Sequence, residues 1–381
     1  MKKTLMIILS ERLSSIISKG EVTDRYYNPN NIFDEVHLIL LNKDNPDLDY
    51  VQKMVGNATV FIYNIPVISP FVSCGYNNIF FKRWIYKFYP LIKTIKPDII
   101  RSYGNFINSI VGYNISKKFN IPHLISIHVD EYAPVILKNR TLKQRFLKIL
   151  LNKKLKISLK NANILLPVYS PIKNSLKSIQ NLESTIIYNT VNPSNLIKKD
   201  KYTFKNTFKI ISIGRQFYAK DISNIILALK NIPNIHFTIV GDGPLHYTLV
   251  EKVKKSNVIE KVTFIKSLSN DEITKSLHTF DAFVTHSDFY EVSKCFIECF
   301  NVGLPVITNK HQNFTIDEML QAKCILVNNN PQSYQNAIES LISSQQLREE
   351  IGFCHKKFAK EFLSPKLTED KHSEVYKKFL N

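Results

Sequence analysis

The sequence predicts an α/β protein made of two doubly wound units, each a parallel sheet with helices on both faces. Short apolar runs, typical of strands that are buried on both faces, alternate along the chain with longer segments of helical periodicity. Short connections between these segments favour parallel sheets. With 381 residues, 44% of them hydrophobic, the chain is long enough for two domains that each bury a core.

The expected strands fall into two groups. In the first unit they cover residues 4–9, 35–41, 59–63, 98–101, 123–127 and 163–166. In the second unit they cover residues 210–213, 236–240, 262–265, 281–285 and 304–308. Helical periodicity is clear at residues 107–118, 222–229, 245–253 and 293–301. Residues 14–31 lack a long helical pattern, and we expect a loop there that either connects two elements or contributes to a ligand site.

Glycines and cations gather where the strands of the second unit end. Gly214 and Arg215 follow its first strand, Lys220 comes soon after, and Gly241 and Asp242 follow its second strand. Open parallel sheets bind ligands beyond the carboxyl ends of their strands, where glycine allows a close approach to the backbone. Helix starts, arginine and lysine all attract anions. The pattern indicates a phosphate site, with solvated surface cations as the alternative.

Two glutamates, Glu291 and Glu298, follow the strand at residues 281–285. Carboxylates suit sugar hydroxyls, because each carboxylate accepts several hydrogen bonds. Ser293 is a candidate N-cap, so the backbone amides of Ser293 and Lys294 would face a diphosphate. The alternative for Glu298 is a solvated position, but its helix is apolar on most faces, and a buried glutamate needs a partner.

Taken in order, these motifs resemble the family-4 glycosyltransferases of the GT-B fold. The resemblance rests on Gly214-Arg215, Lys220, residues 240–244, the two glutamates and Gly303-Leu304-Pro305-Val306-Ile307. It implies two Rossmann-like domains facing across a cleft. It also implies a retaining transfer from a nucleotide diphosphate sugar, with no metal and no cofactor besides that co-substrate. Retention by a front-face route or through a transient intermediate stays open.

The resemblance assigns roles to the motif residues. The donor diphosphate would be held by Gly214, Arg215, Lys220, Ser293 and Lys294. The nucleoside and its ribose would be held by Gly241, Asp242 and Glu298. Glu291 would contact the donor sugar as a catalytic residue. One residue fewer separates the glutamates than in the family pattern, so Tyr290 is the alternative at the first position, and Asp221 stands where glycine is common.

The resemblance also suggests where the domains begin and end. An acceptor-side domain would cover residues 1–190, and a nucleotide-sugar-binding domain would cover residues 191–362. Residues 188–193 form a turn-rich segment that resembles the family's interdomain crossing. Residues 363–381 would form a helix that packs back on the first domain.

His128 is the candidate catalytic residue of the first domain. It directly follows the strand at residues 123–127, at the ligand edge of that sheet. In the resembling family a histidine at this place contacts the donor sugar or the reacting centre, whereas a lone histidine is more commonly structural. Asp130 and Glu131 follow it and are weaker candidates for acceptor contacts or a general base.

The formal net charge of +19 is concentrated in the first domain. Eleven lysines and arginines and no acidic residue lie between Tyr132 and Leu182. Residues 141–160 have the pattern of a basic amphipathic helix, and residues 80–89 mix aromatic with basic side chains. Both patterns favour an anionic membrane surface. The alternative is that the apolar side chains face the core and the lysines are merely solvated.

Other classes are less consistent with the sequence. The five cysteines form no CxxC pair, which argues against structural zinc and favours reduced thiols in the cytoplasm. The basic first domain adds the expectation of a peripheral location at the inner face of the membrane. No stretch is apolar enough to span a bilayer, and no nucleic-acid-binding motif is present. A nucleotide-sugar epimerase of the same fold stays open, as does a basic membrane-surface binding protein with a degenerate donor site.

Overall fold

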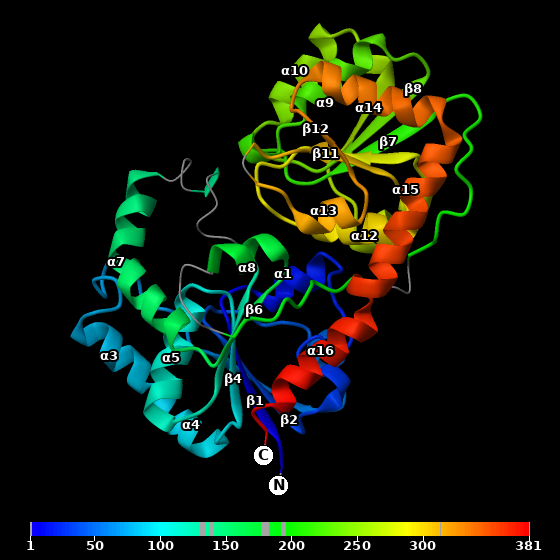
Figure 1. Cartoon of the computed structure of the whole chain (residues 1–381). Helices are drawn as coiled ribbons and strands as arrows, with labels where there is room; N and C mark the ends of the chain where they lie inside the picture. The colour runs from blue at the N-terminus through cyan, green and yellow to red at the C-terminus, as the bar shows by residue number, and fades with distance from the viewer. Residues whose placement is uncertain are drawn as a thin grey trace. The chain divides into compact units, whose positions relative to one another are not determined.

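The computed structural model describes residues 2–129, 135–136, 141–176, 183–191, 196–312 and 314–380. The chain divides into two compact units, one of Met1–Asn189 with Lys366–Asn381 and the other of Thr190–Pro365. Each unit contains a six-stranded sheet whose paired strands are all parallel (Figure 1). The prediction of two doubly wound α/β units is therefore confirmed.

The sheet of the first unit has the order β3-β2-β1-β4-β5-β6. Its strands are β1 (Thr4–Leu9), β2 (Glu35–Leu40), β3 (Thr59–Asn64), β4 (Ile99–Tyr103), β5 (His123–Ile127) and β6 (Ile164–Pro167). Its helices are α1 (Leu13–Ser18), α2 (Leu48–Val55), α3 (Ile79–Tyr86), α4 (Phe88–Ile95), α5 (Ile107–Phe119), α7 (Leu142–Lys160), α8 (Ser170–Leu176) and α16 (Pro365–Lys377), with a 3-10 turn at Pro29–Asn31.

The sheet of the second unit has the order β12-β11-β10-β7-β8-β9. Its strands are β7 (Phe208–Ile213), β8 (Ile235–Val240), β9 (Val262–Ile265), β10 (Ala282–Val284), β11 (Val306–Asn309) and β12 (Ile325–Val327). Its helices are α9 (Ser223–Ala228), α10 (His246–Lys255), α11 (Asn270–Ser276), α12 (Lys294–Val302), α13 (Asp317–Gln321), α14 (Pro331–Ser343) and α15 (Gln345–Phe358). Short helical turns are η4 (Tyr218–Lys220), η5 (Leu229–Asn231), η6 (Ile259–Lys261), η7 (Leu277–Thr279) and η8 (Ala359–Leu363).

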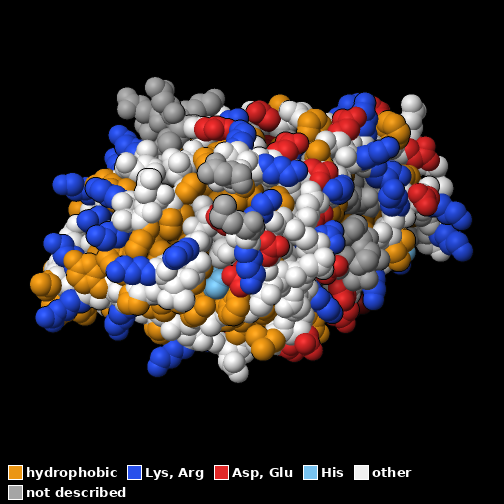
Figure 2. All heavy atoms as spheres, turned by 90° about the horizontal axis from the view of Figure 1, so that it is seen from below, with side chains coloured by type: hydrophobic (Ala, Val, Ile, Leu, Met, Phe, Trp, Pro, Cys, Tyr) orange, Lys and Arg blue, Asp and Glu red, His pale blue; other side chains and the backbone are white. Residues whose placement is uncertain are grey.

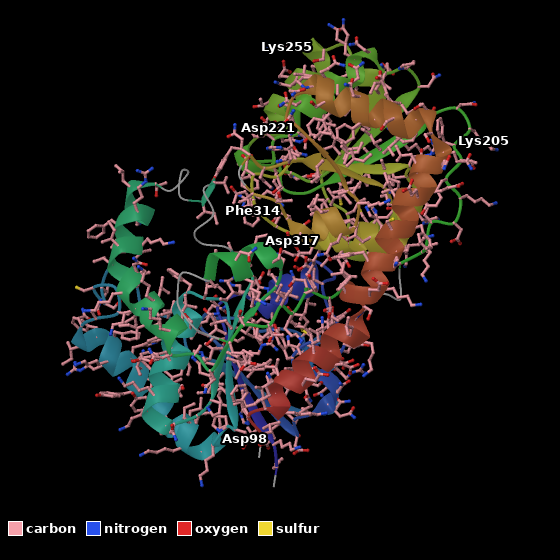
Figure 3. All side chains as sticks on the ribbon, viewed as in Figure 1. Asp98, Lys205, Asp221, Lys255, Phe314 and Asp317 are labelled. Carbon is pink, nitrogen blue, oxygen red and sulfur yellow. The ribbon has the colours of Figure 1, made fainter. Side chains whose placement is uncertain are left out.

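Both sheets reverse their strand order once. In the second unit β7, β8 and β9 follow one another toward one edge, and the chain then returns to place β10 on the other side of β7. In open parallel sheets, ligands usually bind outside the carboxyl ends of the strands at such a reversal, which here lies between β7 and β10. Figure 3 labels Asp221 and Phe314 on the side where these strands end, and Lys205 on the opposite side.

The apolar runs of the sequence are explained by burial on both faces of each sheet. In β1, Leu5, Ile7 and Leu9 belong to one core cluster. Met6 and Ile8 alternate with them and belong to a second cluster on the other face. A strand covered on both sides gains from an apolar residue at every position, so alternation with polar residues disappears.

The last helix, α16, belongs to the first unit. The Tyr376 ring is buried against Phe33, with 5.0 Å between the ring centroids. The buried Arg101 guanidinium donates to the Tyr376 hydroxyl at 2.6 Å and contacts His372 Nε2 at 2.8 Å. Burial, together with the nearby Arg101, lowers the pKa of His372 well below its ordinary value. The neutral imidazole therefore accepts the Arg101 hydrogen bond.

Residues 14–31 match the expected loop only in part: residues 19–28 are turns and irregular chain, whereas the start of the segment is helical. They include most of α1, and the Ser14 hydroxyl near its start donates to Asp44 Oδ1 at 2.5 Å. Leu13 is buried, and Ile16 and Ile17 pack against the same core cluster. The helix was missed because six residues are too few to show a clear helical period. Among the residues that the structure describes, no helix combines the length and apolar composition needed to cross a membrane.

The carboxyl end of helix α12 in the second unit is held by a hydrogen bond from Tyr202 to the carbonyl of Gly303. The Tyr202 hydroxyl donates to the Gly303 carbonyl, directly after α12, at 2.8 Å. The Tyr202 ring also lies against Gly352 of α15, where an added Cβ would be only 1.9 Å from the Tyr202 hydroxyl oxygen. Because Gly352 has no side chain, the Tyr202 ring fits against α15 and its hydroxyl reaches the Gly303 carbonyl at the end of α12.

We predict that Gly352→Ala destabilises the second unit. Alanine normally stabilises a helix relative to glycine by about 1 kcal/mol, but here the methyl group forces Tyr202 to move, and overpacking of this kind costs about 1–3 kcal/mol. Thermal unfolding of the variant should show a lower Tm than the native chain. Phe353→Ala, at an exposed neighbouring position, is the matched control and should change Tm little. An unchanged or raised Tm for Gly352→Ala would contradict this packing account.

Candidate functional site

The loops that leave β7 and β10 bring two predicted residues together. Lys220 Nζ lies 2.6 Å from Glu291 Oε1, and both side chains are mostly shielded from solvent. The Ser287 hydroxyl donates to the same glutamate oxygen at 3.1 Å. The site at the strand-order reversal therefore presents an ammonium and a carboxylate in direct contact. Lys220 is thus not a freely solvated surface cation.

Two turns, at Gly214 after β7 and at Gly241 after β8, lie beneath this ion pair and are called the glycine floor below. The Gly214 amide donates to the Val240 carbonyl at 3.0 Å, so the turn after β7 lies directly beside the turn after β8. Gly241 has a φ of 136°, and a Cβ added there would be 2.0 Å from the Gly214 carbonyl oxygen. Only glycine meets both the backbone conformation and the close contact. The Lys220 side chain passes over the same floor, 3.8 Å from the Cβ position of Gly214.

Gln216 joins the two turns, although sequence reasoning did not identify it. Its Nε2 donates to the Gly241 carbonyl at 2.6 Å, and its backbone amide donates to the Asp242 carbonyl at 3.0 Å. The remaining amide oxygen accepts from His246 Nδ1 at 2.9 Å, which places the imidazole proton on that nitrogen. The Gln216 side chain is buried. A lone glutamine carries no sequence signal, because its partners are backbone atoms of another loop.

Arg215 and Asp242 lie at the exposed border of the turns. The Arg215 guanidinium is 5.9 Å from the centroid of the Phe217 ring and is exposed to solvent. Asp242 Oδ1 accepts the Gly243 amide at 2.7 Å, and Oδ2 lies 3.6 Å from Lys266 Nζ. The Gly243 hydrogen bond, supported by Lys266, lowers the pKa of Asp242 below its ordinary value. Asp242 is therefore a carboxylate at neutral pH, and it faces outward beside the glycine floor.

Glu298 lies on α12 and does not face water. Its side chain is 2% exposed, and Oε1 accepts from Asn270 Nδ2 at 2.7 Å. Ser293 is the N-cap of α12 by backbone conformation, and Lys294 is the first residue of the helix. Within the described part of the chain, the Ser293 hydroxyl makes no capping hydrogen bond. The solvated alternative for Glu298 is thus wrong, and Asn270 is a second residue that the sequence did not reveal.

The structure decides which residue of the β10 loop faces Lys220. The Tyr290 ring stacks on Phe314, with 4.7 Å between ring centroids and 12° between the ring planes. It also lies edge-on to His311. Glu291 points to Lys220 instead. Despite the shortened spacing between the glutamates, the carboxylate and not the tyrosine therefore reaches the lysine.

The candidate residues of the first unit are only partly described. His128 follows β5, and its ring stacks on Tyr103 with 5.6 Å between centroids and 19° between planes. The Arg101 guanidinium also lies over the Tyr103 ring, 4.4 Å from its centroid. Tyr103 and Arg101 thus hold the His128 ring against the end of the sheet. Asp130 and Glu131, as well as residues 192 and 193 of the expected crossing, lie outside the described residues.

Comparisons with known proteins agree with this architecture. Residues 194–357 match the family model described as glycosyl transferases group 1. An uncharacterized glycosyltransferase of Methanocaldococcus jannaschii is 26% identical over 80% of this chain and 81% of its own length. Alpha-monoglucosyldiacylglycerol synthase of Acholeplasma laidlawii is 25% identical over 60% of this chain and 62% of its own length. HepE of Anabaena, solved in complex with UDP and glucose, is similar in fold, with a TM-score of 0.70 and 15% identity over 99% of this chain and 100% of its own.

We predict that Gln216→Leu destabilises the second unit. Leucine preserves the bulk but leaves the Gly241 carbonyl and the His246 N–H without their partner, and each such loss costs about 1–3 kcal/mol. The measurement is chemical unfolding followed by circular dichroism. Tyr218→Ala, two positions away and exposed, is the control and should unfold like the native chain. Equal stability of Gln216→Leu and the control would show that Gln216 does not hold the turns together.

Proposed function

Because this chain is a group 1 glycosyltransferase of the GT-B fold, we propose that it transfers a sugar from a nucleotide diphosphate sugar, with retention of configuration and without a metal ion. The observation that carries the proposal is the contact between Lys220 and Glu291 over the glycine floor of the second unit. A cation and a carboxylate so placed serve the two ends of one donor: the diphosphate and the sugar hydroxyls.

The proposed diphosphate site combines backbone and side-chain groups. Gly214 gives the phosphates room beside the backbone, and Lys220 and Arg215 supply positive charge next to it. The start of α12 at Ser293 adds the positive end of a helix dipole. As the bond to the sugar breaks, negative charge grows on the leaving diphosphate, and these fixed groups stabilise it. In this scheme they do the work of the divalent metal used by other sugar transferases.

Donor binding requires the Lys220–Glu291 pair to separate. The two side chains keep 25% and 19% of their surface exposed, so the pair is neither fully solvated nor fully buried and solvent still reaches it. A diphosphate with two or more negative charges competes effectively for the lysine. Once Lys220 turns to the phosphate, the Glu291 carboxylate is released for hydroxyls of the donor sugar. The pair therefore couples arrival of the donor to exposure of the glutamate.

The nucleoside side of the donor site is assigned to Glu298. Its carboxylate is oriented by Asn270, and in this proposal it accepts hydrogen bonds from adjacent ribose hydroxyls. Gly241 and Asp242 border the same floor. UDP is the first nucleotide to test, because the similar HepE structure contains UDP. A saccharide or lipid-linked acceptor for cell-surface polysaccharide or glycolipid synthesis fits the named relatives, one of which is a monoglucosyldiacylglycerol synthase.

We also propose that the first unit associates with the anionic inner face of a membrane. Near the start of α7, Leu142, Phe146 and Ile149 are 84%, 55% and 74% exposed. Phe80 and Tyr86 of α3 are also exposed. Basic side chains lie among these residues at positions Lys82, Arg83, Lys87, Lys143 and Arg145. Figure 2 shows hydrophobic and basic side chains interleaved at the left of the view, where α3 lies in Figure 1.

The two readings of α7 apply to different parts of the helix. Leu151 and Leu155, in its second half, belong to the core cluster that also contains Trp84 of α3. In the first half, Leu142, Phe146 and Ile149 are exposed, whereas Leu147 is partly buried and packs against the same cluster. An exposed mixture of aromatic, aliphatic and basic side chains suits the headgroup region of a bilayer. A cytoplasmic, peripheral location is the corresponding proposal for the whole chain.

The donor proposal predicts selective binding of one nucleoside diphosphate, measured by calorimetry with UDP, GDP and ADP. Lys220→Ala and Glu298→Ala should each weaken binding at least tenfold, because loss of a hydrogen bond to a charged group costs about 1.5–3 kcal/mol. Lys230→Ala and Glu339→Ala remove the same charges at exposed positions of the same unit and serve as matched controls.

Three outcomes would argue against the donor proposal. Binding that is indifferent to Lys220 and Glu298 would remove its structural basis. Loss of transfer in the presence of EDTA, restored by a divalent cation, would contradict metal independence. Conversion of the nucleotide sugar with no acceptor present would indicate an epimerase instead.

The membrane proposal predicts sedimentation with vesicles that contain phosphatidylglycerol and much weaker sedimentation with phosphatidylcholine alone. Each basic residue near an anionic surface contributes about 1 kcal/mol, and salt should weaken the interaction. The double substitution Leu142→Asp and Phe146→Asp should strongly reduce binding. Tyr247→Asp, at a site 83% exposed in the second unit, is the control. Equal binding to neutral and anionic vesicles, or no effect of the double substitution, would contradict this proposal.

A further inference from the structure

A cavity of about 250 Å³ lies in the second unit beside the Lys220–Glu291 pair. Ser287 and Phe289, from the loop after β10, form part of its wall. The Ser287 hydroxyl is hydrogen-bonded to Glu291, and Lys220 Nζ is 6.0 Å from the centroid of the Phe289 ring. The cavity and the candidate donor site therefore share one wall.

The rest of the lining combines apolar side chains with five polar residues, Thr308, Asn309, Lys310, His311 and Thr315. Phe296 of α12, Met319 of α13 and Leu326 of β12 contribute side chains, together with Phe314. Leu320 also lines the cavity and is 54% exposed, so it marks the side that opens to solvent. Figure 3 labels Phe314 and Asp317 on the chain segment that leads into α13. The cavity is therefore a hollow of the surface that is lined in part by aromatic and aliphatic side chains, the kind of lining that small-molecule sites have.

The wall nearest Glu291 is rigid and polar. The Ser287 amide donates to Asn309 Oδ1 at 2.8 Å, and Asn309 Nδ2 donates back to the Ser287 carbonyl at 3.0 Å. This double hydrogen bond fixes Ser287 between the cavity and the glutamate. Tyr290 packs between Phe314 and His311, two further lining residues, and braces the neighbouring wall. A ligand in the cavity would thus have its polar end toward Glu291 and its apolar body away from it.

We propose that this cavity binds the hydrocarbon portion next to the reacting hydroxyl of a lipid acceptor. The inference deepens the proposed function and depends on it for the identity of the reaction. It gives the second unit a part of the acceptor site, whereas the family resemblance assigns the acceptor side to residues 1–190. A saccharide would lose hydrogen bonds to water against phenylalanine, methionine and leucine side chains, whereas a hydrocarbon loses none. The volume equals that of about eight water molecules. It accommodates a short part of a chain, and the remainder would leave past Leu320.

The test compares two probes that share a sugar headgroup and differ in the chain. Binding of n-octyl β-D-glucoside, below its micelle concentration, and of methyl β-D-glucoside is measured by calorimetry on the full chain. We expect the octyl compound to bind at least tenfold more tightly than the methyl compound. Leu326→Trp should abolish this difference by filling the cavity. Leu320→Asp, at an exposed position that tolerates a charge, should reduce it at least threefold.

The matched control is Ile259→Trp, which adds the same bulk at a position that is 56% exposed and does not line the cavity. It should bind the octyl compound like the native chain. Equal affinity of the two glucosides for the native chain would overturn the proposal, and so would native-like octyl binding by both cavity variants. If Leu326→Trp fails to fold, the test rests on Leu320→Asp: reduced octyl binding supports the proposal, and native-like octyl binding overturns it.

Nucleotide binding by the same preparations separates this inference from the proposed function. Loss of octyl binding in a cavity variant that still binds the nucleotide supports the acceptor assignment. Octyl binding by a native chain that binds no nucleoside diphosphate would overturn both the donor site and the acceptor assignment. Nucleotide binding without any preference for the octyl chain would overturn the cavity assignment alone.

Discussion

The contact between the turns after β7 and β8 is the constraint on which the candidate site depends. A Cβ at Gly241 would lie 2.0 Å from the Gly214 carbonyl oxygen, so any side chain there pushes the two turns apart. Gln216 can bridge the turns only while they touch. Lys220 reaches Glu291 by crossing the same floor. Backbone packing at two glycines thus fixes the positions of the charged side chains, while those side chains themselves contribute little to stability.

The charged groups of the site are arranged for exchange and not for maximal stability. Lys220 and Glu291 are paired but remain partly exposed, whereas Glu298 is buried and oriented by a neutral amide. A partly exposed ion pair can separate when a more highly charged ligand replaces one of the partners. A buried carboxylate with one firm partner keeps its orientation. In the proposed reaction, the first arrangement suits the diphosphate and donor sugar, and the second suits the ribose.

The sequence predicted the architecture better than it predicted the site. Strands β1, β5 and β9 begin and end where expected, because burial on both faces leaves uninterrupted apolar runs. Lys220 and Glu291 were identified from their places after strand ends, and the family resemblance assigned their roles, but neither predicted their direct contact. Gln216 and Asn270 were missed because each acts through a partner that is distant in the chain. In α7 the exposed Leu142 and Phe146 and the buried Leu151 belong to one apolar pattern, and only tertiary packing separates the exposed from the buried positions.

The most direct test of the account is a crystal structure of the chain with bound UDP. The account predicts that the diphosphate lies over Gly214, with Lys220 Nζ about 2.8 Å from a phosphate oxygen and no longer in contact with Glu291. It also predicts ribose hydroxyls at Glu298, whose other oxygen stays bonded to Asn270. A nucleotide bound elsewhere, with Lys220 and Glu291 still 2.6 Å apart, would contradict the central claim that this pair opens to receive the donor.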